Sequence, residues 1–356
     1  MESILAIVQP YSRTQDQCQS YFRSSIEAGC AQSGMEYRED GPPFRAGLRF
    51  LGRVRGTERY SGLVPLKIRN PLLDGFASLF GVSPRGNAVG QYVYNGPAGQ
   101  VKFCIDAEDS GDLAHADLLA WSDLYFKTNY WPGRKYPSKV QPLANVNPLV
   151  LWRSSELRAL RNTEPEWDVF GFFRVWGRID HNLALFEALA RLKCRTKLIG
   201  YLISTDYKGE AARLEKAGIA WIRHPMPLAE LWQTAAKSRL NIVRHGVEDC
   251  IPWRMTDMLA MGHCPVLDYS ARTEWHVPLI EGTHYLSLGV HPEEGLSPEE
   301  SAQRVVERVE GWLAHQNLIA DTGRNAAKYF DDHLTPEKLG QYIVEQVRKT
   351  TIQPGS

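Results

Sequence analysis

Residues 248–268 read EDCIPWRMTDMLAMGHCPVLD, and this stretch decides how the rest of the chain is interpreted. It predicts an acidic loop, a helix that stops at Gly262, and a buried strand over Cys264–Leu267. Asp249 and Asp257 lie eight positions apart, and Gly262 follows the second acid by five. A polar loop, a helix and a short apolar strand in this order are typical of an α/β domain.

The start of this helix has the residue types that a bound nucleotide needs. A carboxylate near a helix N-terminus accepts both hydroxyl hydrogens of a ribose, and the helix dipole with its free N–H groups favours anionic phosphates. Arg254, in the first turn, adds a bidentate phosphate contact. The same pattern also describes an ordinary amphipathic helix with a glycine cap, so the motif leaves both interpretations open.

Length and composition narrow the class of protein. The 356 residues are enough for two domains, and the 41 basic and 41 acidic side chains argue against nucleic acid as a bulk partner. Hydrophobic residues make up 43% of the chain, but its apolar runs are too short for a transmembrane segment. The opening MESILAIVQPY lacks a basic n-region, so no signal peptide is expected. Six scattered cysteines without metal spacing favour a reducing, cytoplasmic location.

The second half of the chain alternates strands with helices, which predicts parallel βαβ units in a doubly wound sheet. The expected strands lie at 169–173, 197–203, 220–222, 240–243 and 264–267. The proline-rich stretch Pro132–Pro148 predicts the linker between the two halves. The first half is harder to assign between residues 34 and 94, where Leu48–Phe50 and Ala88–Tyr94 favour strands and Pro71–Phe80 favours a helix.

The first half also begins as an α/β domain, with a strand over Ile4–Gln9, a polar loop and a helix over Gln17–Gln32. A later strand, Val101–Ile105, runs into the acidic loop DAEDSGD, and the next strand, residues 123–126, ends at Lys127. Because carboxyl ends of parallel strands meet at one edge of a sheet, we expect these acids and the lysine to share that edge. The alternative is that DAEDSGD is a solvated surface loop.

Together these features resemble a glycosyltransferase of the GT-B architecture. The second-half stretch NIVRHGVEDCIPWRMTDMLAMGHCPVL is similar to bacterial group 1 glycosyltransferases that carry an arginine three residues before the second motif acid, here Arg254. The family has Glu at both acid positions, whereas this chain has Asp249 and Asp257. The resemblance covers residues 166–345 as a pattern and is close only over Asp249–Val266.

The resemblance implies two Rossmann-like doubly wound domains that face a cleft. Residues 1–140 would form the acceptor-side domain, 149–330 the nucleotide-sugar domain, and 331–356 a C-terminal helix that crosses back to the first domain. The implied activity moves a sugar from a nucleotide-sugar donor, a co-substrate, to a hydroxyl of a glycan or other acceptor, as in glycan biosynthesis. No further cofactor and no metal is expected, because arginines and helix dipoles neutralise the leaving diphosphate.

The resemblance also gives the candidate residues their roles. Arg174 and Arg178 would bind the diphosphate of the donor. Arg244, His245 and Arg254 would lie near its phosphate or sugar. Asp249 would contact the sugar hydroxyls, and Asp257 the ribose. An inverting enzyme also needs a base in the first domain. We expect Asp106 in that role, with Glu108 and Asp109 orienting the acceptor and Asp16 as the next candidate base. The arginines are equally compatible with a solvated surface.

Other functions stay open at this point. A dinucleotide-dependent dehydrogenase or epimerase needs GxGxxG after a strand, and neither first-strand loop has it. A catalytically degenerate, sugar- or nucleotide-binding partner subunit is compatible with the Asp-for-Glu changes. A metal-dependent GT-A transferase needs a DxD motif at the end of a central strand, where DAED is the nearest match.

Overall fold

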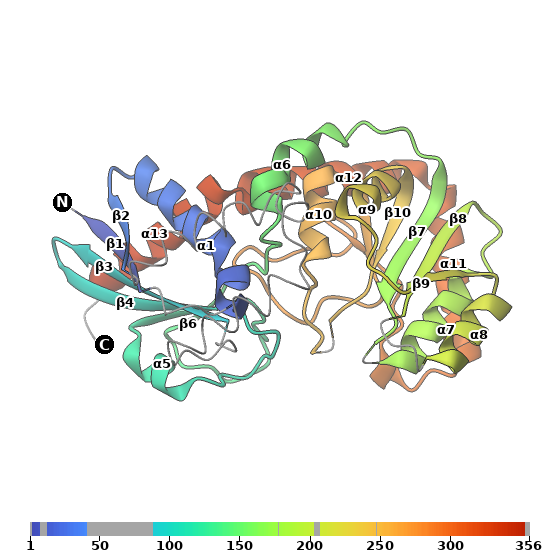
Figure 1. The fold of residues 1–356 in the computed structure, drawn as a ribbon, viewed down its shortest axis with the longest axis horizontal. Coiled ribbons are helices and arrows are strands. Elements are labelled where there is room, and N and C mark those ends of the chain that lie inside the picture. The colour runs from blue at the N-terminus through green and yellow to red at the C-terminus, as the bar shows by residue number, and fades with distance from the viewer. Residues whose placement is uncertain are drawn as a thin grey trace. The chain divides into compact units, whose positions relative to one another are not determined.

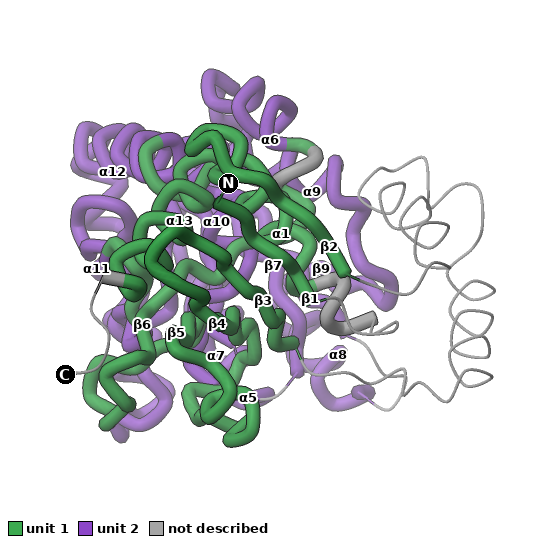
Figure 2. The backbone as a smooth tube through the Cα atoms, turned by 90° about the vertical axis from the view of Figure 1, so that its left-hand side faces the viewer, with its two compact units in different colours: residues 1–153, 274–277, 332–356 green, residues 154–273, 278–331 purple. Residues whose placement is uncertain are grey.

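The chain forms two compact units, drawn in green and purple in Figure 2. The computed structural model describes residues 2–7, 13–40, 88–176, 178–202, 207–246 and 248–352. The first unit contains residues 1–153, 274–277 and 332–356, and the second contains 154–273 and 278–331. The expected strand at Leu48–Phe50 and the expected helix at Pro71–Phe80 lie outside the described residues.

The sheet of the first unit has six strands in the order β2-β1-β3-β4-β5-β6. They are β1 (Ser3–Ile7), β2 (Glu36–Asp40), β3 (Val89–Gly96), β4 (Gly99–Asp106), β5 (Leu124–Lys127) and β6 (Val140–Pro142). β3 runs antiparallel to β1 and β4, because only two residues separate it from β4 and so short a connection allows no crossover. The sheet is therefore mixed where the sequence predicted a parallel one, although β4, β5 and β6 are parallel.

Helices cover both faces of this sheet (Figure 1). α1 (Arg13–Gln32) and α13 (Pro336–Ile352) pack together on one face, and the short α5 (Ala116–Trp121) contacts β4 from the other face. The last helix of the chain thus belongs to the first unit. α6 (Val150–Ala159) then leads into the second unit.

The two helices α1 and α13 cross at glycines. A Cβ on Gly340 would lie 1.7 Å from the carbonyl oxygen of Ser25, and a Cβ on Gly29 would lie 2.4 Å from the backbone of Gly340. Both contacts are with backbone atoms, which have no rotamer to move aside. The first and last helices of the described chain therefore pack at a distance that only glycine allows at their crossing point.

We expect Gly340→Ala to lower the free energy of unfolding by about 1–3 kcal/mol, because the added methyl group forces the two helices apart. Gly311→Ala is the matched control, since a Cβ there meets no atom within 4 Å and the change should stabilise its helix by about 0.5–1 kcal/mol. Thermal unfolding of both variants measures the difference. Equal midpoints for the two would show that the helices do not approach this closely.

The second unit has the doubly wound sheet that the sequence predicts, in the order β12-β11-β10-β7-β8-β9 with all paired strands parallel. The strands are β7 (Trp167–Arg174), β8 (Thr196–Tyr201), β9 (Ala220–Ile222), β10 (Ser238–Val243), β11 (Cys264–Leu267) and β12 (Leu286–Ser287). The strand order reverses between β7 and β10. In open α/β sheets, ligands bind outside the carboxyl ends of the strands at such a reversal.

Two helical layers cover this sheet (Figure 1). One layer contains α7 (Ile179–Leu189), α8 (Lys208–Lys216) and α11 (Pro298–Ala314), and the other contains α9 (Leu228–Ala236), α10 (Arg254–Met261) and α12 (Gln316–Tyr329). The expected inner face of α7 is buried, and its Phe186 stacks on Phe173 of β7 at 3.8 Å between ring centroids. Short helices, η2 (Pro292–Glu294) and η3 (Phe330–Leu334), complete the described chain, in which no helix has the length and apolarity to cross a membrane.

Candidate functional site

Charged side chains gather at the carboxyl ends of β7, β10 and β11 in the second unit. The strands end nearly level, because β10 pairs in register with β7 on one side and β11 on the other. Arg178 lies at the start of α7, after β7, while Arg244 and His245 follow β10 directly. Asp268 and Tyr269 follow β11. The sheet thus brings together residues that lie up to about ninety positions apart, at the edge where a doubly wound fold binds its ligand.

Asp249 is the centre of a cluster of donors. Its buried carboxylate accepts hydrogen bonds from Arg178 Nη1 (2.6 Å) and the Tyr269 hydroxyl (2.7 Å) on Oδ1, and from Arg272 Nη1 (3.3 Å) and His291 Nε2 (3.4 Å) on Oδ2. We call these five residues the Asp249 cluster. Burial alone would raise the pKa of Asp249, but the hydrogen bonds from Tyr269 and Arg178 bring it below its ordinary value.

The cluster gives Asp249 a different set of contacts from those expected. The resemblance placed its carboxylate on donor-sugar hydroxyls, whereas here both oxygens already accept hydrogen bonds from protein side chains. Its backbone has φ of +55°, a left-handed conformation that is unusual for a residue other than glycine. This arrangement fixes the guanidinium groups of Arg178 and Arg272 in place. Asp249 therefore acts in the structure as the anchor of two arginines.

Arg244 is a partly buried cation. It makes no hydrogen bond or ion pair within the described part of the chain, and burial lowers the pKa of its guanidinium, with Asp268 opposing that shift. A desolvated charge without a counterion costs free energy. The position at the end of β10 therefore favours an anion from outside the protein.

A second carboxylate, Asp268, holds two histidines. Its Oδ1 lies 2.5 Å from Nδ1 of His245, and its Oδ2 lies 3.3 Å from Nε2 of His181 in α7. His245 also stacks flat on Tyr269, with 3.9 Å between the ring centroids, so this group touches the Asp249 cluster. His245 was expected from the sequence, whereas Asp268 and His181 were not. We call Asp268, His181 and His245 the Asp268 group.

Arg254 and Asp257 of α10 are held by neighbouring elements. Arg254 Nη1 donates to the carbonyl oxygen of Phe172, its guanidinium lies 5.0 Å from the Phe172 ring centroid, and burial lowers its pKa to about 10. The buried Asp257 accepts a hydrogen bond of 3.0 Å from Nε1 of Trp232 in α9. Gly262 ends α10, as the sequence predicted, and does so in the left-handed conformation. The expected phosphate and ribose contacts of the two side chains stay predictions.

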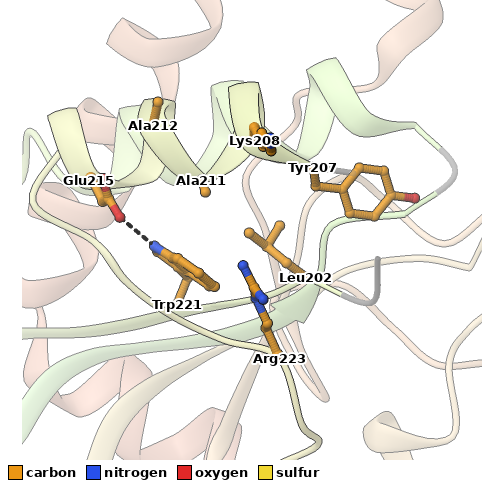
Figure 3. A pocket seen from close by; sticks show the side chains of 8 residues that line it. All are labelled: Leu202, Tyr207, Lys208, Ala211, Ala212, Glu215, Trp221 and Arg223. Atoms are coloured by element: carbon orange, nitrogen blue, oxygen red, sulfur yellow. Dashed lines mark hydrogen bonds between the residues drawn. The ribbon is translucent and has the colours of Figure 1, made fainter. Parts of the chain in front are cut away.

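A pocket opens at the carboxyl ends of β8 and β9 (Figure 3). Its volume is about 200 Å³, and it lies between α8 and the ends of these two strands. Leu202 and Tyr207 after β8 and Trp221 and Arg223 of the β9 segment line it on one side, and α8 contributes Lys208, Ala211, Ala212 and Glu215. The Trp221 indole donates to Glu215 Oε1 at 2.9 Å, and the Arg223 guanidinium lies 5.4 Å from the Trp221 ring centroid. Because β8 pairs with β7, the pocket lies on the same edge of the sheet as Arg178.

Asp106 of the first unit lies in an environment that does not suit a general base. Its side chain and that of Lys127 are both fully buried, with Nζ 2.9 Å from Oδ2, and the same oxygen accepts from the Tyr125 hydroxyl at 2.8 Å. Its other oxygen accepts the backbone N–H of Glu108. Register explains the pair, because Asp106 and Lys127 are direct partners on β4 and β5. A base must reach an acceptor hydroxyl, and this carboxylate reaches only protein.

The other three expected acids differ in exposure. Glu108 is half-buried and accepts the backbone N–H of Ala88 at 2.8 Å. Asp109 is exposed. Asp16 falls in α1, where its side chain lies outside the described structure.

In the second unit, the expected Arg174 is exposed, with its guanidinium 4.9 Å from the ring of Trp176. Among the described residues, no three or more His, Cys, Asp or Glu side chains lie together in a group that could hold a metal ion.

Comparison with known proteins identifies the architecture. No family model and no curated protein matches the sequence. Among solved structures, Anabaena Alr3699/HepE in complex with UDP and glucose is 13% identical with a TM-score of 0.51, over 98% of this chain and 100% of that one. TarM is 8% identical with a TM-score of 0.51, over 99% of both chains.

The chain has the GT-B fold. At these identities the similarity concerns the fold alone, but it extends over nearly the whole length of each protein. The fold class predicted from the sequence is therefore confirmed. Within this GT-B chain, the Asp249 cluster and Arg244 occupy the second unit, which the resemblance assigned to the nucleotide sugar.

Proposed function

We propose that the protein is a glycosyltransferase that moves a sugar from a nucleotide-sugar donor to a hydroxyl of a glycan or another acceptor. The observation that carries this proposal is Arg244, a partly buried cation that makes no hydrogen bond or ion pair within the described residues, beside Arg178 at the strand reversal of the second sheet. HepE, whose fold this chain shares, was crystallised with UDP and glucose. We further place the activity in glycan biosynthesis in the cytoplasm.

The diphosphate would bind at the start of α7. Among the described residues no side chain caps this helix, so its first N–H groups are free to bind an anion, and the helix dipole adds partial positive charge there. Arg178 precedes its first residue and is oriented by Asp249. Arg244 supplies a second cation from the end of β10. One guanidinium group can donate two parallel hydrogen bonds to two phosphate oxygens, which is why arginine suits this role better than lysine.

The nucleoside would occupy the pocket beside β8 and β9. Its volume of about 200 Å³ suits one flat ring system, and Trp221 and Leu202 give it an apolar wall. Tyr207 and Arg223 provide hydrogen-bond donors at its rim (Figure 3). β7, β8 and β9 are neighbours in the sheet, so a nucleotide with its phosphates at β7 can extend its base toward this pocket.

In the transfer step, the bond between the sugar's anomeric carbon and the phosphate oxygen breaks. Its electron pair stays on that oxygen, while the acceptor oxygen forms the new bond and gives up its proton. Preorganised cations that face the developing phosphate charge lower the barrier, because they need no rearrangement as the charge forms. Arg178 and Arg244 would play this part, and Asp109 and Glu108 remain candidates for handling the acceptor's proton.

We expect transfer to survive EDTA, because arginine side chains and the α7 dipole take over the charge that a metal would neutralise. The experiment follows release of nucleoside diphosphate from a panel of UDP-, GDP- and ADP-sugars, with and without EDTA. Arg244→Met serves as the variant that should lose the activity. A strict requirement for manganese or magnesium would contradict this expectation and move the DAED loop from surface loop to metal ligand. No release from any donor, together with nucleotide binding, would indicate a degenerate binding subunit instead.

A further inference from the structure

The Asp268 group combines one carboxylate with two histidine rings at the candidate donor site. Asp268 and His245 are each 1% exposed, and the Asp268 carboxylate also accepts the backbone N–H of His245 at 3.1 Å. His181 is the more accessible of the two histidines, with 15% of its side chain exposed. It lies in the first turn of α7, the helix for which the described structure has no side-chain cap.

The hydrogen bonds fix where the protons are. Burial would raise the pKa of Asp268, but the positive charge that His245 and His181 can carry, together with their hydrogen bonds, holds it far below its ordinary value, so the carboxylate is ionised. An ionised carboxylate only accepts hydrogen bonds, so Nδ1 of His245 and Nε2 of His181 must carry protons. The remaining ring nitrogen of His245, Nε2, is buried and has no partner in the described structure. The group therefore has vacant ring nitrogens that can accept a further proton.

We propose that the Asp268 group takes up a proton when a nucleoside diphosphate binds to the second unit, and so adds positive charge to the donor site. This inference rests on the proposed function. With both rings neutral the group carries one negative charge, which repels an incoming diphosphate. Protonation of one ring nitrogen by solvent cancels that charge, and the proton returns to solvent when the nucleotide leaves.

The surrounding charges make the added proton useful. The titratable and charged groups near the Asp268 group are Arg178, Arg244, Asp249, Cys250, Tyr269 and His291. Arg178 is matched by Asp249, whereas Arg244 makes no ion pair in the described structure and is influenced only at longer range by Asp268. A nucleoside diphosphate carries about three negative charges above pH 7, since its terminal phosphate has its second pKa near 6. One free arginine does not balance that charge, so the site gains from a second cation.

Calorimetric titration with UDP, GDP and ADP tests the proposal. Titrations at pH 7.5 in two buffers with different ionisation enthalpies give the number of protons taken up on binding, because the ligand itself is fully ionised there. We expect uptake of up to one proton by the wild type. Its affinity should then rise by up to about tenfold per pH unit as the pH falls from 8.5 to 7.5. The sign follows from linkage, because a complex that holds more protons is favoured at lower pH.

The variants His181→Gln and His245→Gln assign the proton. A glutamine amide still offers an N–H to Asp268 but does not titrate, so the double variant should bind with no proton uptake and a flat pH dependence. The His181→Gln single variant should lower the proton uptake. Because His181 is partly exposed, this variant still tests the proposal if the change at the buried His245 impairs folding. His315→Gln, at an exposed position at the end of α11, is the control and should match the wild type.

The outcomes separate this inference from the proposed function. Nucleotide binding by the wild type without proton uptake overturns the inference and leaves the proposed function standing. Uptake that persists unchanged in both histidine variants also overturns it, because another group then titrates. Failure of all three nucleotides to bind overturns the proposed function and the inference together.

Discussion

Replacing Lys127 by methionine should lower the free energy of unfolding by about 3–5 kcal/mol, the typical cost of removing one partner from a buried ion pair. The variant leaves the Asp106 carboxylate without solvent and without its cation, since both side chains are fully buried. Methionine fills much of the same volume, so the loss reports the charge rather than a cavity. Denaturant unfolding of the wild type and the variant measures the difference.

Two comparisons make this result specific. The double variant Asp106→Asn with Lys127→Met removes both charges and should recover much of the loss, because no uncompensated charge remains. Arg134→Met breaks an exposed ion pair with Asp112 and should cost at most about 1 kcal/mol. If Asp106→Asn alone left stability unchanged but abolished transfer, Asp106 would be the base that the sequence suggested rather than a structural partner of Lys127.

Replacing both Arg178 and Arg244 by alanine should weaken nucleoside diphosphate binding by about 10²–10⁴-fold. Each arginine is expected to contribute hydrogen bonds to a charged phosphate, worth about 1.5–3 kcal/mol. Calorimetry measures the affinity, and circular dichroism checks that the variant is folded. Arg195→Ala is the matched control, because Arg195 pairs with Asp168 at the opposite, amino edge of the same sheet.

The Arg244→Met variant distinguishes an arginine that binds nucleotide from one that supports the fold. The variant removes a partly buried cation that makes no ion pair in the described structure, so the nucleotide-free protein should be as stable as the wild type or more stable. Nucleotide affinity should fall at the same time. Lower stability with unchanged affinity would instead mean that Arg244 supports the fold.

Most of the second unit could be predicted from the sequence because its elements have strong local signals. The strands Ala220–Ile222 and Cys264–Leu267 have the expected boundaries, and Gly262 ends α10 as expected. The first unit was harder. β2 reads EYRED, with no apolar alternation, and only its pairing with β1 makes it a strand. The direction of β3 depends on its two-residue connection to β4, which directly follows the region that was hard to assign from the sequence.

The candidate site was predicted only in part. From the sequence, Arg178, Arg244, His245 and Asp249 were all expected at the donor site. The structure brings the four residues together at one edge of the second sheet. It also adds Arg272 and His291, which come from irregular segments without a local pattern. Asp268 did have a signal, because it directly follows a buried strand. Asp106 also directly follows a buried run of the sequence, but the prediction that it acts as a base does not fit the structure. The residue opposite it on the next strand is a lysine, and the pair is buried.

A crystal structure of the protein with a bound nucleoside diphosphate tests the central claim most directly. The claim is that the strand reversal between β7 and β10 holds the diphosphate. The predicted result is a diphosphate at the N-terminus of α7, within about 3 Å of guanidinium nitrogens of Arg178 and Arg244, with the base directed to the pocket at Trp221. A nucleotide bound elsewhere, with both arginines free of phosphate, would contradict it.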